Sequence, residues 1–315
     1  MSKPATTAAV AAFFVVVICL WACHTNLSQI AVPKDDPLKM QVEHGRYLVT
    51  AVTHCTMCHS LLDTKKFSQP VVPGTEGGGG IALHESAPGF PGKLWFPNIT
   101  PYALKDWNDA ELVRAITKGI RKNGDTLFPA MPFHIFSKMC KEDISSIIAY
   151  LRTMKPIDTS YPKREMFVPM STFGPLPDND YTTNPKPDTL DKLQYGKYLT
   201  TIAACEGCHT PIKGRAQEGK LFAGGNDFTF PDFIVNTANI TPDSSTGIGT
   251  WTEQMFIAKF RKNSTPGKLN QRPEKFNTIM PWSFFGKMKD GDLKAIYAYL
   301  RSVPAVNNPI VIWPR

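Results

Sequence analysis

Apolar side chains recur at helical spacing in two stretches of the chain, about 150 residues apart. Each stretch follows the i, i+3, i+4, i+7 pattern of one buried helix face. The first consists of Ile144, Ile147, Ile148 and Leu151, and the second of Leu293, Ile296, Tyr297 and Leu300. Shorter helical patterns cover residues 109–120 and 253–261, and no convincing run of alternating residues indicates a strand. The pattern therefore predicts an all-α fold.

The first of the two long helices is expected to begin at Cys140. Asp143 stands three residues later, in the place of the acid of a capping box. The matching position before the second helix is Lys289. Cys140 is therefore interpreted as a helix-start residue and not as a metal ligand.

The chain begins with a charged residue, Lys3, followed by the uncharged and strongly apolar stretch 8–22. With residues 5–7 this stretch approaches the roughly 20 residues of a membrane span. A charged start and an apolar core also describe a signal peptide. Residues 20–23, which end in Cys23, resemble a bacterial lipoprotein cleavage box. We expect residues 1–23 to be a signal or anchor segment that is retained as a helix, replaced by a lipid on Cys23, or cleaved.

Several short motifs occur twice in the same order, about 150 residues apart. The pairs are residues 45–48 with 196–199, 55–59 with 205–209, 98–101 with 239–242, 131–132 with 280–281, and 149–152 with 298–301. Two copies of one domain, residues 34–157 and 192–315, explain this repeat. Residues 158–191 between them are rich in proline, which predicts an extended connector. Apolar side chains for docking it are Met166, Phe167, Val168, Phe173 and Tyr181.

The composition excludes several broad classes of protein. Charged residues make up 20% and hydrophobic ones 42%, which argues against a disordered chain. The net charge is +8, but the basic residues form no block, so nucleic acid is not an expected partner. Seven cysteines in 315 residues are too few for a disulfide scaffold. Four of the seven form two Cys-x-x-Cys pairs, and each pair is followed directly by histidine.

Cys-x-x-Cys-His is the attachment signature of c-type haem. Two thiols three residues apart on a helical turn can each form a thioether with a vinyl group, and the next residue directs an imidazole at the iron. The residues are Cys55, Cys58 and His59 in the first copy and Cys205, Cys208 and His209 in the second. The alternatives are a zinc site and a dithiol redox motif, neither of which requires the histidine. The sequence therefore predicts two covalently attached haem c groups with His59 and His209 as iron ligands.

A second ligand for each iron is predicted from the repeat. Met131 follows His59 by 72 residues and Met280 follows His209 by 71, and each methionine precedes a proline. A thioether in a proline-bounded loop loses little entropy on ligation. His/Met ligation raises the reduction potential and leaves no open coordination position. The expected chemistry is one-electron transfer.

Other candidate ligands have no counterpart in the second copy or lie on the wrong side of the haem. They are His54, Met57, His84, His134, Met166 and Met170. Each is interpreted as a packing or surface residue. Glycines at 74 and 77–80 lack the Lys-Ser/Thr of a phosphate-binding loop and are interpreted as a mobile loop.

Each copy resembles a class I cytochrome c domain, from the helix before Cys-x-x-Cys-His to the final Tyr-Leu-Arg helix. Asn239-Ile240-Thr241-Pro242, Met280-Pro281-Trp282 and the segment 296–301 more narrowly resemble the cytochrome c subunits of membrane-bound alcohol, aldehyde and gluconate dehydrogenases. The similarity covers roughly residues 40–157 and 190–305. Those subunits usually carry three haems, whereas this chain has two attachment motifs. The fold expected is thus two tandem class I cytochrome c domains after an apolar segment.

The resemblance and the two His/Met sets imply a dihaem electron carrier anchored on the periplasmic side of a bacterial inner membrane. It would accept electrons from a dehydrogenase or quinol-oxidising complex and pass them to another cytochrome or an oxidase. One alternative is a dihaem enzyme, of the peroxidase or thiosulfate-oxidising type, with one exchangeable iron site. Another is a fixed subunit of a respiratory complex. An electron-transfer protein or subunit is favoured over a stand-alone enzyme.

Overall fold

The computed structural model describes residues 36–83, 90–213, 216–217, 220–273 and 275–314. The predicted signal or anchor segment, Cys23 and His84 lie outside the described residues. The chain divides into two compact units, Met1–Met40 and Gln41–Arg315. In the first unit, residues 37–40 begin helix α2; all contacts discussed below lie in the second. No helix among the described residues is long and apolar enough to cross a membrane.

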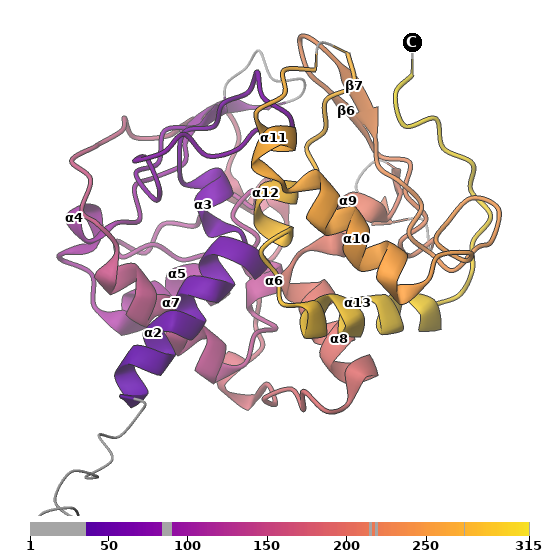
Figure 1. Cartoon of the computed structure of the whole chain (residues 1–315). Coiled ribbons are helices and arrows are strands. Elements are labelled where there is room, and N and C mark those ends of the chain that lie inside the picture. Colours follow the sequence, from indigo (N-terminus) through magenta and orange to yellow (C-terminus); the bar gives the residue numbers. More distant parts are fainter. Residues whose placement is uncertain (1–35, 84–89, 214–215, 218–219, 274, 315) are drawn as a thin grey trace, which may run out of the picture. The chain divides into compact units, whose positions relative to one another are not determined.

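The fold is rich in helix (Figure 1). Up to the connector the helices are α2 (Pro37–Tyr47), the π-helix η1 (Leu48–Val52), α3 (Cys55–Cys58), α4 (Pro101–Leu104), α5 (Asp109–Lys118), α6 (Phe133–Phe136) and α7 (Lys141–Thr153). The connector holds the 3-10 helices η2 (Met170–Phe173) and η3 (Tyr181–Thr183). The later helices are α8 (Lys192–Ile202), α9 (Cys205–His209), α10 (Glu253–Asn263), α11 (Pro266–Leu269), α12 (Trp282–Phe285) and α13 (Asp290–Ser302). The predicted helices are confirmed as α5, α7, α10 and α13.

The apolar faces of the two long helices are buried as predicted. Ile144 on α7 and Leu293 on α13 have no exposed surface. Both belong to one continuous apolar cluster that contains side chains from each copy of the repeat. The two copies therefore share a core within the unit Gln41–Arg315.

Short strands, which the sequence pattern did not predict, accompany the helices. They are β1 (Ala82–Leu83), β2 (Gly92–Trp95), β3 (Glu165–Met166), β4 (Ile212–Lys213), β5 (Ala216–Gln217), β6 (Asp227–Thr229) and β7 (Ile234–Asn236). They form one sheet in the order β1-β2-β3 and two hairpins, all antiparallel. Strands of two to four residues are too short to show an alternating pattern. The all-α prediction therefore holds only in the coarser form of a helix-rich fold.

The repeated Gly-x-Tyr-Leu motif places a glycine where two helices cross. A Cβ atom on Gly45 of α2 would lie 1.8 Å from the carbonyl oxygen of Ser146 on α7. A Cβ atom on Gly196 of α8 would lie 1.9 Å from the carbonyl oxygen of Ala295 on α13. Helices α8 and α13 run against each other in Figure 1. Only glycine permits these two backbones to approach so closely.

The tyrosine of the same motif reaches from each copy to the other. The Tyr198 hydroxyl accepts a hydrogen bond from the Cys140 N–H at 3.2 Å and donates to the Asp143 carboxylate at 2.6 Å. The Tyr47 hydroxyl accepts from the Lys289 N–H at 3.0 Å and donates to Asp292. Each copy thus satisfies an N–H group at the start of the other copy's C-terminal helix.

The hydrogen bonds of Tyr198 take the place of the capping box expected at the start of α7. Cys140 is the N-cap residue, as predicted, but its side chain caps no backbone N–H. A thiol is a weak acceptor, and the Tyr198 hydroxyl stands between the cap backbone and Asp143 instead. The capping-box prediction was therefore wrong, because the partner comes from the other copy of the repeat.

Replacing both tyrosines, Tyr47→Phe with Tyr198→Phe, should lower the free energy of unfolding by about 1–4 kcal/mol, because each change removes a hydroxyl that binds both a helix N–H and a carboxylate. Chemical denaturation measures this loss. Tyr195→Phe is the matched control, since its hydroxyl contacts Asp292 at 3.1 Å within one copy and pairs no helix N–H. A double variant no less stable than this control would contradict the expectation.

The same two substitutions should change how the free energy of unfolding depends on pH in alkaline solution. Burial raises the pKa of Tyr47 and Tyr198 above the ordinary value of 10.0, and the neighbouring carboxylate raises it further. The folded protein therefore holds these protons to higher pH than the unfolded chain. Their contribution to stability is complete below pH 10.0 and is lost as the pH rises above it. The double variant should lose stability less steeply above pH 10 than the wild type does.

The connector lies against the first copy of the repeat; the sequence indicated that it could dock but not on which copy. Glu165 and Met166 extend the sheet by pairing with β2. The Asn184 side-chain amide donates to the carbonyl oxygens of Ser137 and Met139 at 2.7 and 2.8 Å. Phe167 differs from the expectation, because it is 63% exposed.

Candidate functional site

Each Cys-x-x-Cys-His motif directly follows a residue in the left-handed backbone conformation. The residues are His54, with φ of 42°, and Ala204, with φ of 58°. A single helical turn follows in each copy, α3 and α9. A strained conformation at equivalent non-glycine positions indicates a turn whose geometry the surrounding structure imposes. The two motifs therefore adopt the same local structure.

The histidine after each turn is oriented by a backbone carbonyl group. The Nδ1 atom of His59 lies 2.7 Å from the Pro97 oxygen, and Nδ1 of His209 lies 2.7 Å from the Ala238 oxygen. A carbonyl oxygen only accepts hydrogen bonds, so Nδ1 carries the proton and Nε2 keeps a free lone pair. Burial lowers the pKa of both imidazoles, which keeps them neutral. This is the arrangement of a metal-binding histidine.

The Asn-Ile-Thr-Pro motif holds the loop that supplies these carbonyl groups. Asn239 Oδ1 accepts from the Thr241 N–H and hydroxyl at 2.9 and 2.8 Å, and its amide donates to the Val306 oxygen at 2.8 Å. Asn98 makes the equivalent bonds to Thr100 and to the Ile157 oxygen. The motif directly follows Ala238 and Pro97. The asparagine therefore fixes the residue that orients the histidine.

The thiols do not resemble those of a reactive dithiol. Burial raises the pKa of Cys58 to about 11 and that of Cys205 to about 12. Redox-active Cys-x-x-Cys motifs instead have a lowered thiol pKa and a thiolate at neutral pH. This observation disfavours the dithiol alternative.

The two Met-Pro motifs also share one conformation. Pro132 and Pro281 have φ, ψ angles of −82°, 55° and −79°, 63°. The N–H of the residue after each proline donates to the methionine carbonyl oxygen, at 2.8 Å for Met131 and 2.7 Å for Met280. These are inverse γ-turns centred on proline. Both methionines are partly buried and pack against the apolar cluster.

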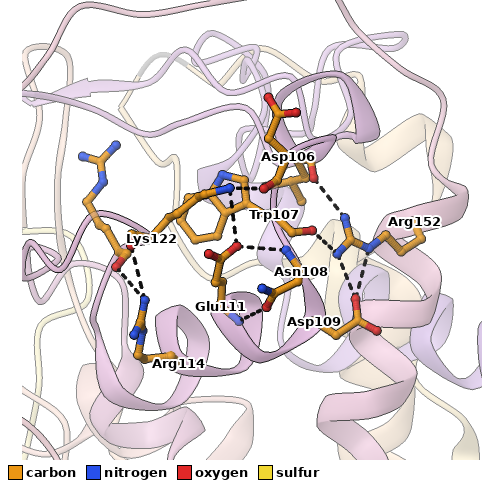
Figure 2. A network of polar contacts seen from close by, with 10 residues as sticks. Asp106, Trp107, Asn108, Asp109, Glu111, Arg114, Lys122 and Arg152 are labelled. Carbon is orange, nitrogen blue, oxygen red and sulfur yellow. Dashed lines mark hydrogen bonds and ion pairs between the residues drawn. The ribbon is translucent and has the colours of Figure 1, made fainter.

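The arginine that ends each Tyr-Leu-Arg motif binds backbone carbonyl groups of another loop of its copy. In the first copy, the Arg152 guanidinium donates to the carbonyl oxygens of Leu104 and Trp107 at 2.9 and 2.5 Å and pairs with Asp109 (Figure 2). Arg301 donates to the carbonyl oxygens of Ile248 and Gly249 in the second copy. The Tyr-Leu-Arg motif thus ties each C-terminal helix to the loop that carries Trp107 in the first copy and Trp251 in the second.

Each methionine loop has one neighbouring feature that bears on a bound group. A cavity of about 400 Å³ is lined by Phe128, Pro129, Ala130 and Phe173, directly before Met131 in the chain. In the second copy the buried Ser283 hydroxyl, three residues after Met280, has no hydrogen-bond partner among the described residues. An orphaned buried hydroxyl is rare in a complete site. The unpaired Ser283 hydroxyl is compatible with a group bound beside the second methionine loop. The hollow in the first copy is open, and Cys55, Cys58, His59 and Met131 do not line it.

The other candidate ligands lie in different surroundings. His54 packs edge-on against Phe284 and Phe285, at ring-centre distances of 6.2 and 5.3 Å. His134 is exposed, and Met166 belongs to β3. These positions agree with packing and surface roles.

Sequence reasoning missed one residue beside the second methionine loop. The Ser68 hydroxyl donates to the Met280 carbonyl oxygen at 2.7 Å, although 212 residues separate the two. Ser68 belongs to neither a repeated motif nor a predicted helix. No signal in the sequence indicates this contact.

Comparison with known proteins identifies relatives of this chain. The cytochrome c subunit of a quinone alcohol dehydrogenase from Gluconacetobacter polyoxogenes is 31% identical over 292 residues, which cover 84% of this chain and 56% of the subunit. The cytochrome subunit of a fructose dehydrogenase from Gluconobacter japonicus is 28% identical over 288 residues, or 84% of this chain and 53% of the subunit. This chain therefore spans about half the length of these relatives. No family model matches it.

A third relative is similar in length. The dihaem c-type cytochrome from Cereibacter sphaeroides is 23% identical over 269 residues, which cover 80% of this chain and 82% of that protein. The chain is thus a homologue of the cytochrome c subunits of alcohol and fructose dehydrogenases and of a dihaem cytochrome c. The resemblance predicted from the sequence motifs is confirmed.

Proposed function

Because the chain is a homologue of dehydrogenase cytochrome c subunits, we propose that it is a dihaem c-type cytochrome that passes single electrons. It consists of two tandem class I cytochrome c domains, residues 34–157 and 192–315, joined by the connector 158–191. One haem is held by Cys55, Cys58, His59 and Met131, and the other by Cys205, Cys208, His209 and Met280. The dihaem relative of similar length supports the number of two.

The observation that carries this proposal is the duplication of the local geometry. In both copies a left-handed residue precedes Cys-x-x-Cys-His, and a carbonyl oxygen lies 2.7 Å from the histidine Nδ1. In both copies the methionine closes an inverse γ-turn. Two unrelated sites would not share all these features.

The protein's own residues provide a rigid setting for this chemistry. Haem supplies a one-electron couple, and His/Met ligation favours its reduced form relative to other ligand sets. Pro97 and Ala238 hold the Nδ1 protons, so that each Nε2 is available as a ligand. The proline-centred turns limit the movement of both methionines. Fixed ligands in both oxidation states keep the reorganisation on electron transfer small.

The proposed partners are a dehydrogenase or quinol-oxidising complex as electron donor and a further cytochrome or an oxidase as acceptor. The names of the relatives support a dehydrogenase as donor. We place the protein on the periplasmic side of a bacterial inner membrane, within a respiratory chain. Residues 1–23 would attach it as a helix or through a lipid on Cys23; the support is the apolar sequence of this segment.

Haem content and ligation test the proposal. The purified protein should contain two covalent haems per chain, and Cys205→Ala with Cys208→Ala should leave one.

The oxidised wild type should show a far-red Met-to-iron charge-transfer band that Met131→His with Met280→His abolishes. Absence of this band from the wild type would overturn His/Met ligation. A high-spin iron that binds peroxide would overturn it at the haem that contains this iron. Detergent purification from membranes with identification of bound subunits tests the partner.

A further inference from the structure

The loop that follows His59 crosses to the methionine loop of the other copy. Ser68 lies nine residues after His59 and is 2% exposed. Its hydroxyl donates to the Met280 carbonyl oxygen at 2.7 Å and accepts from the Trp282 N–H at 3.0 Å. These two groups are the ends of the inverse γ-turn at Pro281. One side chain therefore binds both ends of the turn that carries the proposed iron ligand.

The backbone around Ser68 is held in an unfavourable conformation for this contact. Ser68 and Gln69 have φ angles of 63° and 46°. A non-glycine residue in the left-handed region is unfavourable and persists only when the surrounding structure imposes it. Strain of this kind tends to occur at functional positions.

Contacts with the second copy impose this conformation. Asn277, which lies three residues before Met280, accepts from the Ser68 N–H at 3.0 Å and donates to the Lys66 oxygen at 3.1 Å. The Phe67 N–H donates to the Gln271 oxygen at 2.8 Å, and the Lys268 ammonium lies 4.4 Å from the centre of the Phe67 ring. The loop is therefore fixed on both sides of Ser68.

We infer that Ser68 is a positioning residue for Met280, through which the first copy of the domain controls methionine ligation at the second haem. Its two hydrogen bonds hold the γ-turn closed and limit the distance that the Met280 backbone can move away from the iron. The inference rests on the proposed function, because it takes Met280 as an iron ligand. It adds a residue from outside the second copy to that site.

Competition by imidazole measures how firmly methionine is held. Ser68→Ala removes both hydrogen bonds and leaves the ends of the γ-turn without this partner. In the oxidised two-haem protein, the imidazole concentration that displaces half of the methionine at the second haem should fall about tenfold. The concentration needed at the first haem should stay unchanged. The far-red band reports displacement, and Met280→His assigns the second haem.

Two further variants separate positioning from a loss of folding. Ser68→Gly also removes the hydroxyl but relieves the left-handed backbone, so it should show the same imidazole sensitivity with a better-retained fold. Ser146→Ala is the matched control: this buried hydroxyl donates to the Glu142 oxygen at 2.8 Å within α7, and both haems should respond as in the wild type. Wild-type sensitivity in both Ser68 variants would overturn the inference. If instead the wild type shows no methionine band for the second haem, the proposed ligation itself fails.

Discussion

Replacement of Gly196 by alanine is expected to lower the free energy of unfolding by about 3 kcal/mol or more, the upper end of the range for overpacked sites. The new Cβ atom would lie 1.9 Å from the Ala295 carbonyl oxygen and 2.6 Å from the carbonyl carbon. These are backbone atoms, so no side-chain rotation relieves the contact. Helices α8 and α13 must separate, and the buried residues between them lose contacts.

The same substitution at Gly291 provides a control on α13, the helix against which α8 packs. A Cβ atom there meets nothing within 4 Å. Alanine in place of glycine should stabilise α13 by about 0.5–1 kcal/mol, because it restricts the unfolded chain. Denaturant unfolding of the two variants gives both values. If Gly196→Ala changed stability by no more than Gly291→Ala does, the close crossing would not be needed for the fold.

Gly45→Ala extends the prediction to the other copy. The corresponding distance to the Ser146 oxygen is 1.8 Å. Since the clash has the same geometry, the loss of stability should be similar at both positions. The repeated glycine thus has a packing reason that the motif comparison alone did not supply.

The features that the sequence predicted well are those encoded within short stretches. The apolar spacing of 144–151 and 293–300 predicted α7 and α13, because helical periodicity is local. The motifs that occur twice in the sequence have equivalent backbone conformations in the two copies. A motif of four or five residues carries its own backbone geometry, so its recurrence is informative.

The contacts between the two copies were not predictable in this way. Tyr47 and Asp292 are 245 residues apart, and Ser68 and Met280 are 212 apart. A repeat shows that two segments are alike but gives no information on how they pack together. The error at Cys140 has this origin: the local sequence pattern placed Asp143 in a capping box, whereas Tyr198 from the other copy takes the bonding positions.

Asn239→Ala is expected to affect both stability and the second proposed haem site. Asn239 is 5% exposed, and its side chain binds Thr241, Thr246 and the Val306 oxygen. Alanine leaves the buried Thr241 N–H without this partner, whereas the Val306 carbonyl oxygen keeps a hydrogen bond from the Thr241 hydroxyl at 3.3 Å. At about 1–3 kcal/mol for the unsatisfied N–H and about 1 kcal/mol for each other hydrogen bond lost, the free energy of unfolding should fall by about 3 kcal/mol.

The second effect follows from the position of Asn239 next to Ala238. The Ala238 oxygen fixes the Nδ1 proton of His209 at 2.7 Å, and a hydrogen bond of this kind raises the basicity of a ligating imidazole. When the loop relaxes, that bond lengthens, and the imidazole becomes a weaker donor to iron. A weaker donor stabilises the oxidised iron less, so the reduction potential of one haem should rise while the other stays constant. Asn98→Ala should shift the other haem in the same direction.

Asn263, which is partly exposed, provides the matched control for both effects. Its amide donates to the Lys259 oxygen at 2.8 Å within α10, and surface substitutions of this kind usually change stability by no more than about 0.5 kcal/mol. Denaturant unfolding and potentiometric titration of the three asparagine variants separate the outcomes. A stability loss for Asn239→Ala as small as that for Asn263→Ala would show that the motif does not hold the loop. A normal loss with unchanged potentials would show that the loop holds the fold but does not tune the histidine.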